Sequence, residues 1–264
     1  MAITFVGNNW AGKAGATSGT STIALNSGLT GGSRSSVQAG DLVIAAYATG
    51  STADRTLTIT DGTSDYTLIN TELYANGTGF DVNMRVAYKI MGSTPDASVV
   101  FGATGSSLDA GVMQIFVFSG VAPDTPLDVA AVPATGTGTG QPNPGPITPT
   151  SAGSKIMVFA AGSASGAAEV LAASTSLNGF ISNKASDTNA IVISGGYKDW
   201  TSGAFDPGVY TGNLTASNLA WAAMSIALRP FTEKVYKGNR VWSAAYKGTR
   251  ADAALYKGIR ALHP

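Results

Sequence analysis

The feature that most restricts how this chain can fold is a set of short, uninterrupted apolar runs. The clearest lie at residues 42–47, 112–118 and 156–161, and the second is broken only by Gln114. Such runs are far shorter than the roughly 20 apolar residues of a membrane span, and they are typical of central strands covered on both faces. They predict an all-β, antiparallel β-sandwich, and no membrane partner is expected.

Other segments alternate between apolar and polar residues, which is the pattern of a strand with one solvent-exposed face. Residues 82–90 alternate in this way, and residues 56–60 alternate threonine with leucine and isoleucine. Asp-Gly and Asn-Gly pairs at residues 61–62 and 76–77 mark turns between strands. The alanine-rich residues 164–173 are the one stretch for which we expect a short helix.

Two halves of the chain resemble each other. Residues 39–41 (Ala-Gly-Asp) precede the run at 42–47, and residues 152–154 (Ala-Gly-Ser) precede the run at 156–161. A Tyr-Lys pair also ends a strand pattern in each half, again offset by about 110 residues. Between the halves, residues 133–149 hold five of the eleven prolines, a density that predicts a long surface connection.

These related halves predict one sandwich of jelly-roll type with two Greek-key halves, spanning residues 1–230. Two tandem small sandwiches are the alternative. The N-terminal residues show neither a basic segment nor a long apolar segment, so we expect no secretory signal.

Residues 231–264 contain a sharper repeat, Tyr-Lys-Gly-x-Arg, which starts at Tyr236, Tyr246 and Tyr256 with a period of ten. One such unit fits a short strand, a tight turn and a second short strand, and it is too small to bury its own apolar side. Its aromatic residues therefore need another surface. The predicted assembly interface comprises Tyr236, Lys237, Arg240, Trp242, Tyr246, Arg250, Tyr256 and Arg260.

Charge divides the chain at the same boundary. Residues 231–264 hold 7 Lys+Arg and 2 Asp+Glu, whereas residues 1–230 hold 9 and 14. The basic repeats are open to three interpretations: a nucleic-acid surface, solubilising charges on strand edges, or a contact with an acidic protein surface. The matching opposite charge of the body favours protein contact, and nucleic acid is not expected as a partner.

Most catalytic constellations are absent from this composition. The chain has no cysteine and a single histidine, His263 next to its end, which disfavours thiolate chemistry, a Ser-His-Asp triad and His or Cys metal sites. Asp61, Asp65 and Asp81 are the best carboxylates for a glycosidase pair, and Asp61 with Asp65 for Ca²⁺, but aspartate beside glycine and serine more often forms turns. We therefore expect no enzyme activity, cofactor or metal.

A Gly-x-x-x-x-Gly-Lys motif spans residues 7–13 and follows the apolar residues 3–6. A phosphate-binding loop needs serine or threonine next and a helix after it, whereas Ala14 and a glycine-rich stretch follow here. The motif is better explained as a glycine-rich loop after the first strand.

Exposed aromatic side chains near loops would suit a second function, the binding of carbohydrate. A carbohydrate-binding or adhesin module that recognises a cell-surface glycan is thus the alternative to an assembly role, with a host glycan as partner. The aromatic residues considered for it are Trp10, Tyr74, Phe80, Trp200 and Tyr210.

Several short motifs resemble a module of minor structural proteins from tailed bacteriophages. They are residues 40–44 (Gly-Asp-Leu-Val-Ile), 86–89 (Val-Ala-Tyr-Lys), 118–121 (Phe-Ser-Gly-Val) with 126–128 (Pro-Leu-Asp), and 227–230 (Ala-Leu-Arg-Pro). The segment 235–242 is similar to short C-terminal repeats of phage minor tail proteins.

This resemblance implies a β-sandwich component of a virion, made in the host cytoplasm and carried on the tail, a spike or a fibre. It also implies other virion proteins as partners and a homo-oligomer. It brings no catalytic residues.

Overall fold

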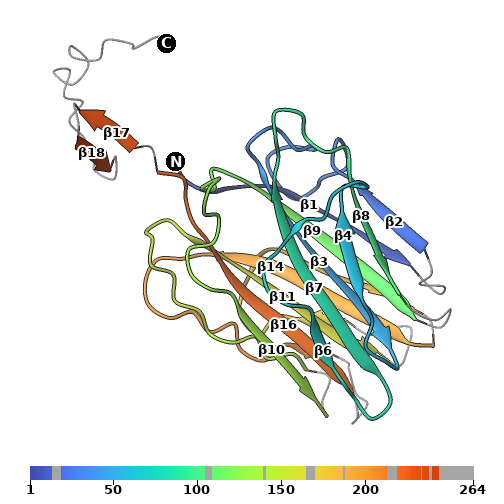
Figure 1. Cartoon of the computed structure of the whole chain (residues 1–264). Coiled ribbons are helices and arrows are strands. Elements are labelled where there is room, and N and C mark those ends of the chain that lie inside the picture. Colours follow the sequence, from blue (N-terminus) through green and yellow to red (C-terminus); the bar gives the residue numbers. More distant parts are fainter. Residues whose placement is uncertain are drawn as a thin grey trace.

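The computed structural model describes residues 1–13, 19–104, 109–138, 141–164, 170–186, 188–212, 219–232, 234–237 and 240–243. Within them the chain is all-β, and the strands pair antiparallel (Figure 1). The antiparallel β character expected from the apolar runs is therefore confirmed. No helix long and apolar enough to cross a membrane occurs in this part of the chain.

Two large sheets form the centre of the molecule. The first sheet has the order β1 (Thr4–Lys13), β9 (Ala110–Ser119), β3 (Leu42–Ser51) and β7 (Asp81–Ile90), with β5 (Thr67–Leu68) and β6 (Leu73–Ala75) beside β7. The second sheet has the order β10 (Val132–Thr137), β16 (Ala220–Leu228), β11 (Lys155–Ala164), β14 (Ala190–Asp199) and β13 (Asn178–Ala185).

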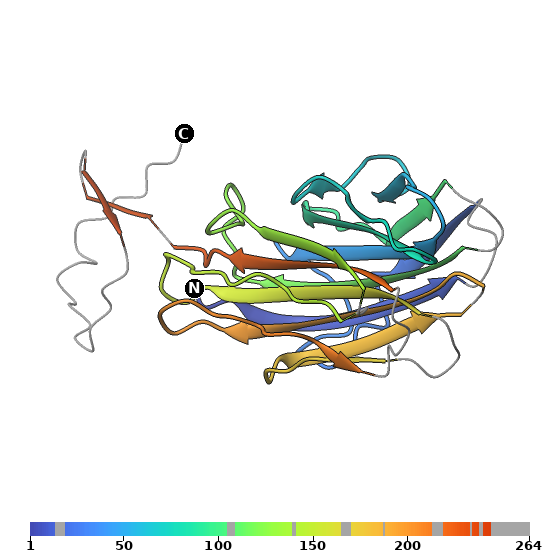
Figure 2. The same cartoon turned by 90° about the horizontal axis from the view of Figure 1, so that it is seen from below.

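Smaller sheets complete the structure. A third sheet, β2 (Gly19–Ala24), β8 (Ser98–Ala103) and β4 (Leu57–Thr60), covers the outer face of the first sheet. Two-stranded pairs are formed by β12 (Leu171–Ala172) with β15 (Thr211–Gly212), and by β17 (Lys234–Lys237) with β18 (Arg240–Ser243). Figure 2 shows the sheets from the side, stacked as layers.

Alternation along each central strand explains the stacking. In β3, Leu42 and Ile44 pack against the second sheet, whereas Val43 and Tyr47 pack against the third sheet. Every residue of this strand is buried. A strand whose two faces are both apolar needs a covering layer on each side, so the first sheet lies between two others.

The outer face of the second sheet is covered by loops rather than by a broad sheet. Ile156 and Val158 of β11 pack there against Ile147 and Tyr210. The proline-rich segment therefore differs from the expected surface connection. It begins as the edge strand β10, where Pro133 is tolerated, and in residues 141–149 it covers the sheet with Pro142, Pro144, Ile147 and Pro149 buried between more exposed residues.

The two large sheets have the same internal order. β1, β9, β3 and β7 correspond in sequence order and position to β10, β16, β11 and β14. Leu42 lies opposite Ile90 and Phe118, just as Lys155 lies opposite Asp199 and Leu228. The likeness between the halves is thus a likeness of strand order and register.

Each half of the chain builds its own sheet, and the two sheets share one core. In a jelly roll, successive strands instead alternate between two sheets. The sandwich-like arrangement is present, but the strand order does not confirm the jelly-roll expectation.

The halves are also joined near the start of β9 and β14. The carboxylate of Asp109 is fully buried and accepts hydrogen bonds from Arg55 Nε and Asn189 Nδ2, each at 2.7 Å. Because Arg55 belongs to the first half and Asn189 to the second, one buried ion links both. Breaking a buried ion pair on one side typically costs about 3–5 kcal/mol, so this contact restricts how the sheets slide.

Two finer sequence expectations are wrong. The polar face of β7 is not exposed to solvent, since Asn83 is fully buried and Arg85 donates to the carbonyl of Leu57 in β4. The expected helix at residues 164–173 is absent from the described part of that segment, which contains the end of β11 and the short strand β12. Residues 165–169 of this segment lie outside the described residues.

A pair of equivalent glycines allows a test of the duplication. Gly40 and Gly153 precede β3 and β11 with φ of 82° and 83°, and neither has an atom closer than 3.8 Å to an added Cβ. We expect Gly40→Ala and Gly153→Ala each to lower the free energy of unfolding by about 1 kcal/mol, from backbone strain alone. Urea unfolding measures this, with Gly92→Ala as the control because Gly92 has open space and no positive φ. Equal stability of all three variants would contradict it.

Candidate functional site

The residues predicted as an assembly interface fall only partly within the described chain. Tyr236 and Lys237 lie on β17, and Arg240 and Trp242 lie on β18. These strands pair antiparallel, with Tyr236 opposite Val241, which agrees with the strand pair expected for the first repeat. Tyr246, Arg250, Tyr256 and Arg260 lie outside the described residues, so their role as an interface stays a prediction.

Two motifs singled out in the sequence, at residues 118–128 and 227–230, meet at one place. Residues 120–128 and 227–231, called here the closure region, run side by side through bridges of Val121 with Pro230 and of Leu127 with Leu228. The amide of Phe231 donates to Gly120 O at 2.8 Å, and the Met1 ammonium donates to Phe231 O at 2.6 Å. Both chain ends of the sandwich are therefore fixed at the same end of the molecule.

Asp128 is the centre of the closure region. Its buried carboxylate accepts hydrogen bonds from the amides and hydroxyls of Thr150 and Ser151, and Arg229 Nε donates to it at 3.3 Å. Burial alone would raise the pKa of Asp128, but the bonds from Ser151 and Thr150 outweigh it and lower the pKa to about 2. The residue thus acts as a structural anion.

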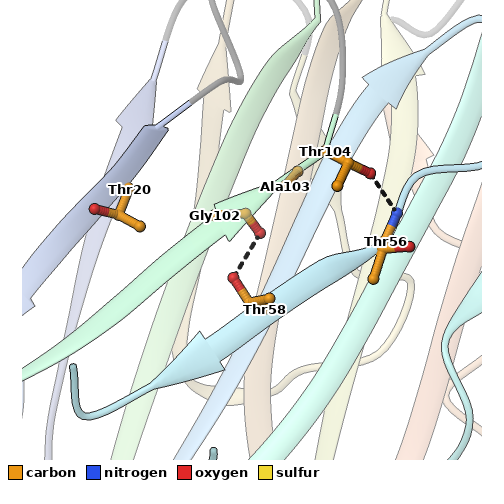
Figure 3. Close-up of a pocket in the computed structure, with 6 residues that line it drawn as sticks. All are labelled: Thr20, Thr56, Thr58, Gly102, Ala103 and Thr104. Atoms are coloured by element: carbon orange, nitrogen blue, oxygen red, sulfur yellow. Dashed lines mark hydrogen bonds between the residues drawn. The ribbon is translucent and has the colours of Figure 1, made fainter. Parts of the chain in front are cut away.

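A shallow groove of about 250 Å³ lies on the outer face of the third sheet (Figure 3). It is called here the threonine groove, and it is lined by Thr20, Thr56, Thr58, Gly102, Ala103 and Thr104. In its centre Gly102 of β8 lies opposite Thr20 on one side and Thr58 on the other. The missing side chain of Gly102 forms the depression.

The chemistry of the threonine groove is limited to hydrogen bonding. Thr58 Oγ1 donates to Gly102 O at 3.2 Å, and Thr104 Oγ1 accepts from the amide of Thr56 at 3.0 Å. No titratable side chain lines it, so it has no group for acid–base work. The alternating threonines of residues 56–60 predicted the exposed face correctly, but the central glycine on β8 gave no separate signal.

Of the three aspartates considered for catalysis, Asp61 and Asp65 share one turn and Asp81 lies apart from them. Asp61 caps its turn by accepting from Thr63 and Ser64, and its Oδ2 lies 2.6 Å from Lys89 Nζ. These bonds, the one with Lys89 first, hold its pKa far below the usual range. Asp65 is exposed in the same turn.

Asp81 starts β7, and about 26 Å of strand separates it from Lys89, the partner of Asp61 near the other end. Position therefore excludes Asp81 from a carboxylate pair with Asp61 or Asp65. Among the described residues, no group of three or more His, Cys, Asp and Glu is placed to hold a metal.

The Gly-x-x-x-x-Gly-Lys motif forms no loop. Residues 7–13 continue β1, paired with β9 from Gly7 to Lys13. Gly7 is required for packing, because a Cβ there would lie 2.9 Å from Leu29 Cβ. The expectation of a glycine-rich loop is wrong, since close contacts rather than a turn explain the glycines.

The aromatic residues proposed for sugar binding differ in exposure. Tyr210 is fully buried, and Tyr74 donates to Asp81 at 2.7 Å, with burial and Asp81 raising its pKa to about 12. Trp200 donates its Nε1–H to Gly203 O, and Phe80 is half-buried against the second sheet. Trp10 alone among the five is classed as exposed, at 47%.

Comparison with known proteins gives no match, because no family model, curated protein or solved structure is significantly similar to the chain.

Asp128 supplies a pH test of the closure region. Its pKa is lowered on folding, so its stabilisation is complete above about pH 4 and is lost as the pH falls toward 2, worth roughly 2 kcal/mol. We expect Asp128→Asn to lower the free energy of unfolding by about that amount at pH 7 and by much less near pH 2. Urea unfolding at both pH values measures it. Asp124→Asn, in the same loop but exposed, is the control, and a pH-independent difference would contradict the expectation.

Proposed function

We propose that this chain is a non-enzymatic structural component of a bacteriophage particle, belonging to a tail, spike or fibre, in which residues 231–264 mediate assembly. The observation that carries the proposal is that the two parts of the chain differ in how their charged side chains are used. The sandwich uses its charged side chains internally, whereas the aromatic and basic repeats lie beyond the last strand of its sheets.

Internal pairing of charge is extensive. At least six of the nine basic residues in 1–230 lie within 4.0 Å of a carboxylate. These basic residues are Arg34, Arg55, Arg85, Lys89, Lys155 and Arg229. Most basic side chains of the body are therefore paired within it, and the charge left for an external partner is mainly acidic, in keeping with the body's net charge of −5.

The closure region gives a second argument for the proposed phage function. The motifs that resemble phage structural proteins do not surround a groove or a cluster of reactive groups; those at residues 118–128 and 227–230 pair with each other. Their chemistry is therefore architectural. A sandwich closed by such contacts, without disulfides, suits a protein that persists outside a cell.

The repeats carry the aromatic and basic residues proposed for contact with a partner. A two-stranded pair the size of β17 and β18 is at best marginally stable in water by itself, so this pair gains stability by packing on another surface. Tyr and Trp dominate the energetics of protein interfaces, and each repeat contains one or more of them. The net charge of +5 in the repeats opposes the net charge of −5 in the body, which favours contact with a neighbouring copy.

Truncation tests the assembly role. We expect the full chain to form a defined oligomer by light scattering at micromolar concentration, and residues 1–232 to be a folded monomer. The truncation keeps Phe231, because its amide bonds to Gly120 in the closure region. A monomeric full chain, or an oligomeric truncation, would contradict self-assembly through the repeats.

Two sets of substitutions separate aromatic packing from charge. Replacing Tyr236, Trp242, Tyr246 and Tyr256 together with alanine should abolish the oligomer, because the contact anchors are removed. Replacing Lys237, Lys247 and Lys257 with alanine is the matched control and should weaken the oligomer only at low salt, where unscreened attraction contributes most. An oligomer that survives the aromatic set and dissociates with the lysine set would assign assembly to charge instead.

A further inference from the structure

Trp10 combines high exposure with a rigid position. It lies within the ten-residue strand β1, opposite Gln114 of β9, and 47% of its surface is exposed. Its amide donates to Asn9 Oδ1 at 2.8 Å. A large aromatic ring on a regular strand loses little further freedom on binding, so its exposure is the mark of a contact surface.

Gly12 shapes the surroundings of this ring. It lies two residues further on the same face of β1, and a Cβ there would lie 3.5 Å from Trp10 Cζ3 and 3.4 Å from Lys184 O. The Cζ3 edge of the indole therefore lies beside Gly12, close to the backbone of β13. This edge of the ring is in contact with the protein, and roughly 100 Å² of the residue remains open to solvent.

The neighbouring strand β13 carries a hydrogen-bonding side chain next to Lys184. Gln114, the cross-strand partner of Trp10, is fully buried and donates through Nε2 to Asn183 Oδ1 at 2.8 Å. This bond fixes the Asn183 amide on β13. Its NH₂ group has no hydrogen-bond acceptor among the described residues, and the side chain is half-buried. A fixed donor pair thus accompanies the partly exposed indole.

The geometry points to a binding subsite for a neutral saccharide at Trp10, in which a pyranose ring stacks on the open face of the indole and a hydroxyl accepts from Asn183. The C–H face of a pyranose is apolar and about as large as one indole, while its rim carries hydroxyls. Stacking plus an amide donor matches both features. The subsite stands independently of the proposed assembly role.

The surroundings favour a saccharide over a protein partner. A stable protein interface buries about 800 Å² per partner around a cluster of apolar anchors. On the face of β1 that carries Trp10, the neighbouring residues are Gly12 and the buried Asn8, and no other large exposed apolar side chain lies on β1. A single exposed ring without apolar neighbours on its strand suits a ligand one or two sugar rings across.

Indole resonances provide the direct test. The ¹⁵N-labelled full chain is titrated to millimolar concentration with neutral oligosaccharides of glucose, mannose, galactose and N-acetylglucosamine, and the Trp10 Nε1–H signal is followed. That signal is assigned by its absence from Trp10→Ala. We expect at least one probe to shift it saturably while the signals of Trp200 and Trp221 stay in place. No shift with any probe would overturn the subsite.

Variants confirm the roles of the two groups. Trp10→Ala should weaken binding of the active probe at least about tenfold. Leu68→Ala, at a side chain 40% exposed on β5, is the control and should leave binding unchanged. Asn183→Asp keeps the acceptor for Gln114 but removes the NH₂ donors, and should weaken binding by about threefold to tenfold. Saccharide binding that survives Trp10→Ala would overturn the proposal. If Trp10→Ala lost only oligomerisation, the proposal would also be overturned and the ring would be a protein contact.

Discussion

The two-sided apolar character of the central strands is the constraint on which the rest of the structure depends. Once β3 and β9 present apolar side chains on both faces, neither face of the first sheet can meet water. The second sheet covers one face and the third sheet the other. The second sheet has the same property, so the proline-rich connection and the loop that carries Tyr210 must cover its outer side. The layered architecture follows from this requirement.

Much of the fold could be predicted because it is encoded locally. The fully apolar runs identified β3, β9 and β11, and the alternating threonines identified the exposed face of β4. The local pattern could not show which segments cover each sheet. The polar residues of β7 looked solvent-exposed, but Arg85 and Asn83 are covered by segments distant in sequence. Likewise, a high proline content indicates poor strand geometry but does not exclude burial, and Pro142 and Pro144 are buried.

The candidate sites were less predictable, for a related reason. Sequence proximity to turns suggested that Asp61 and Asp81 share a strand end. Asp81 instead begins β7, whereas Asp61 contacts Lys89 near the opposite end of β7. Of the aromatic residues, only burial distinguishes Trp10 from Tyr210, and burial depends on tertiary contacts. The role of Gly12 could not be predicted from the sequence either, because it depends on the room that the glycine leaves for its neighbours, the Trp10 indole among them. The internal resemblance of the halves was visible in sequence as two similar strand sets, whereas the shared register of the two large sheets is seen only in the structure.

The position of the two chain ends has a mechanical consequence. Met1 and Phe231 are bonded to each other, and the chain leaves the sandwich there directly after β16. A load applied to the following residues along that strand is shared by β10 and β11, which flank β16 on both sides. Such a pull shears two ladders of hydrogen bonds at once instead of unzipping them one by one. A pull on the residues after β16 is therefore resisted by two hydrogen-bonded ladders loaded in parallel.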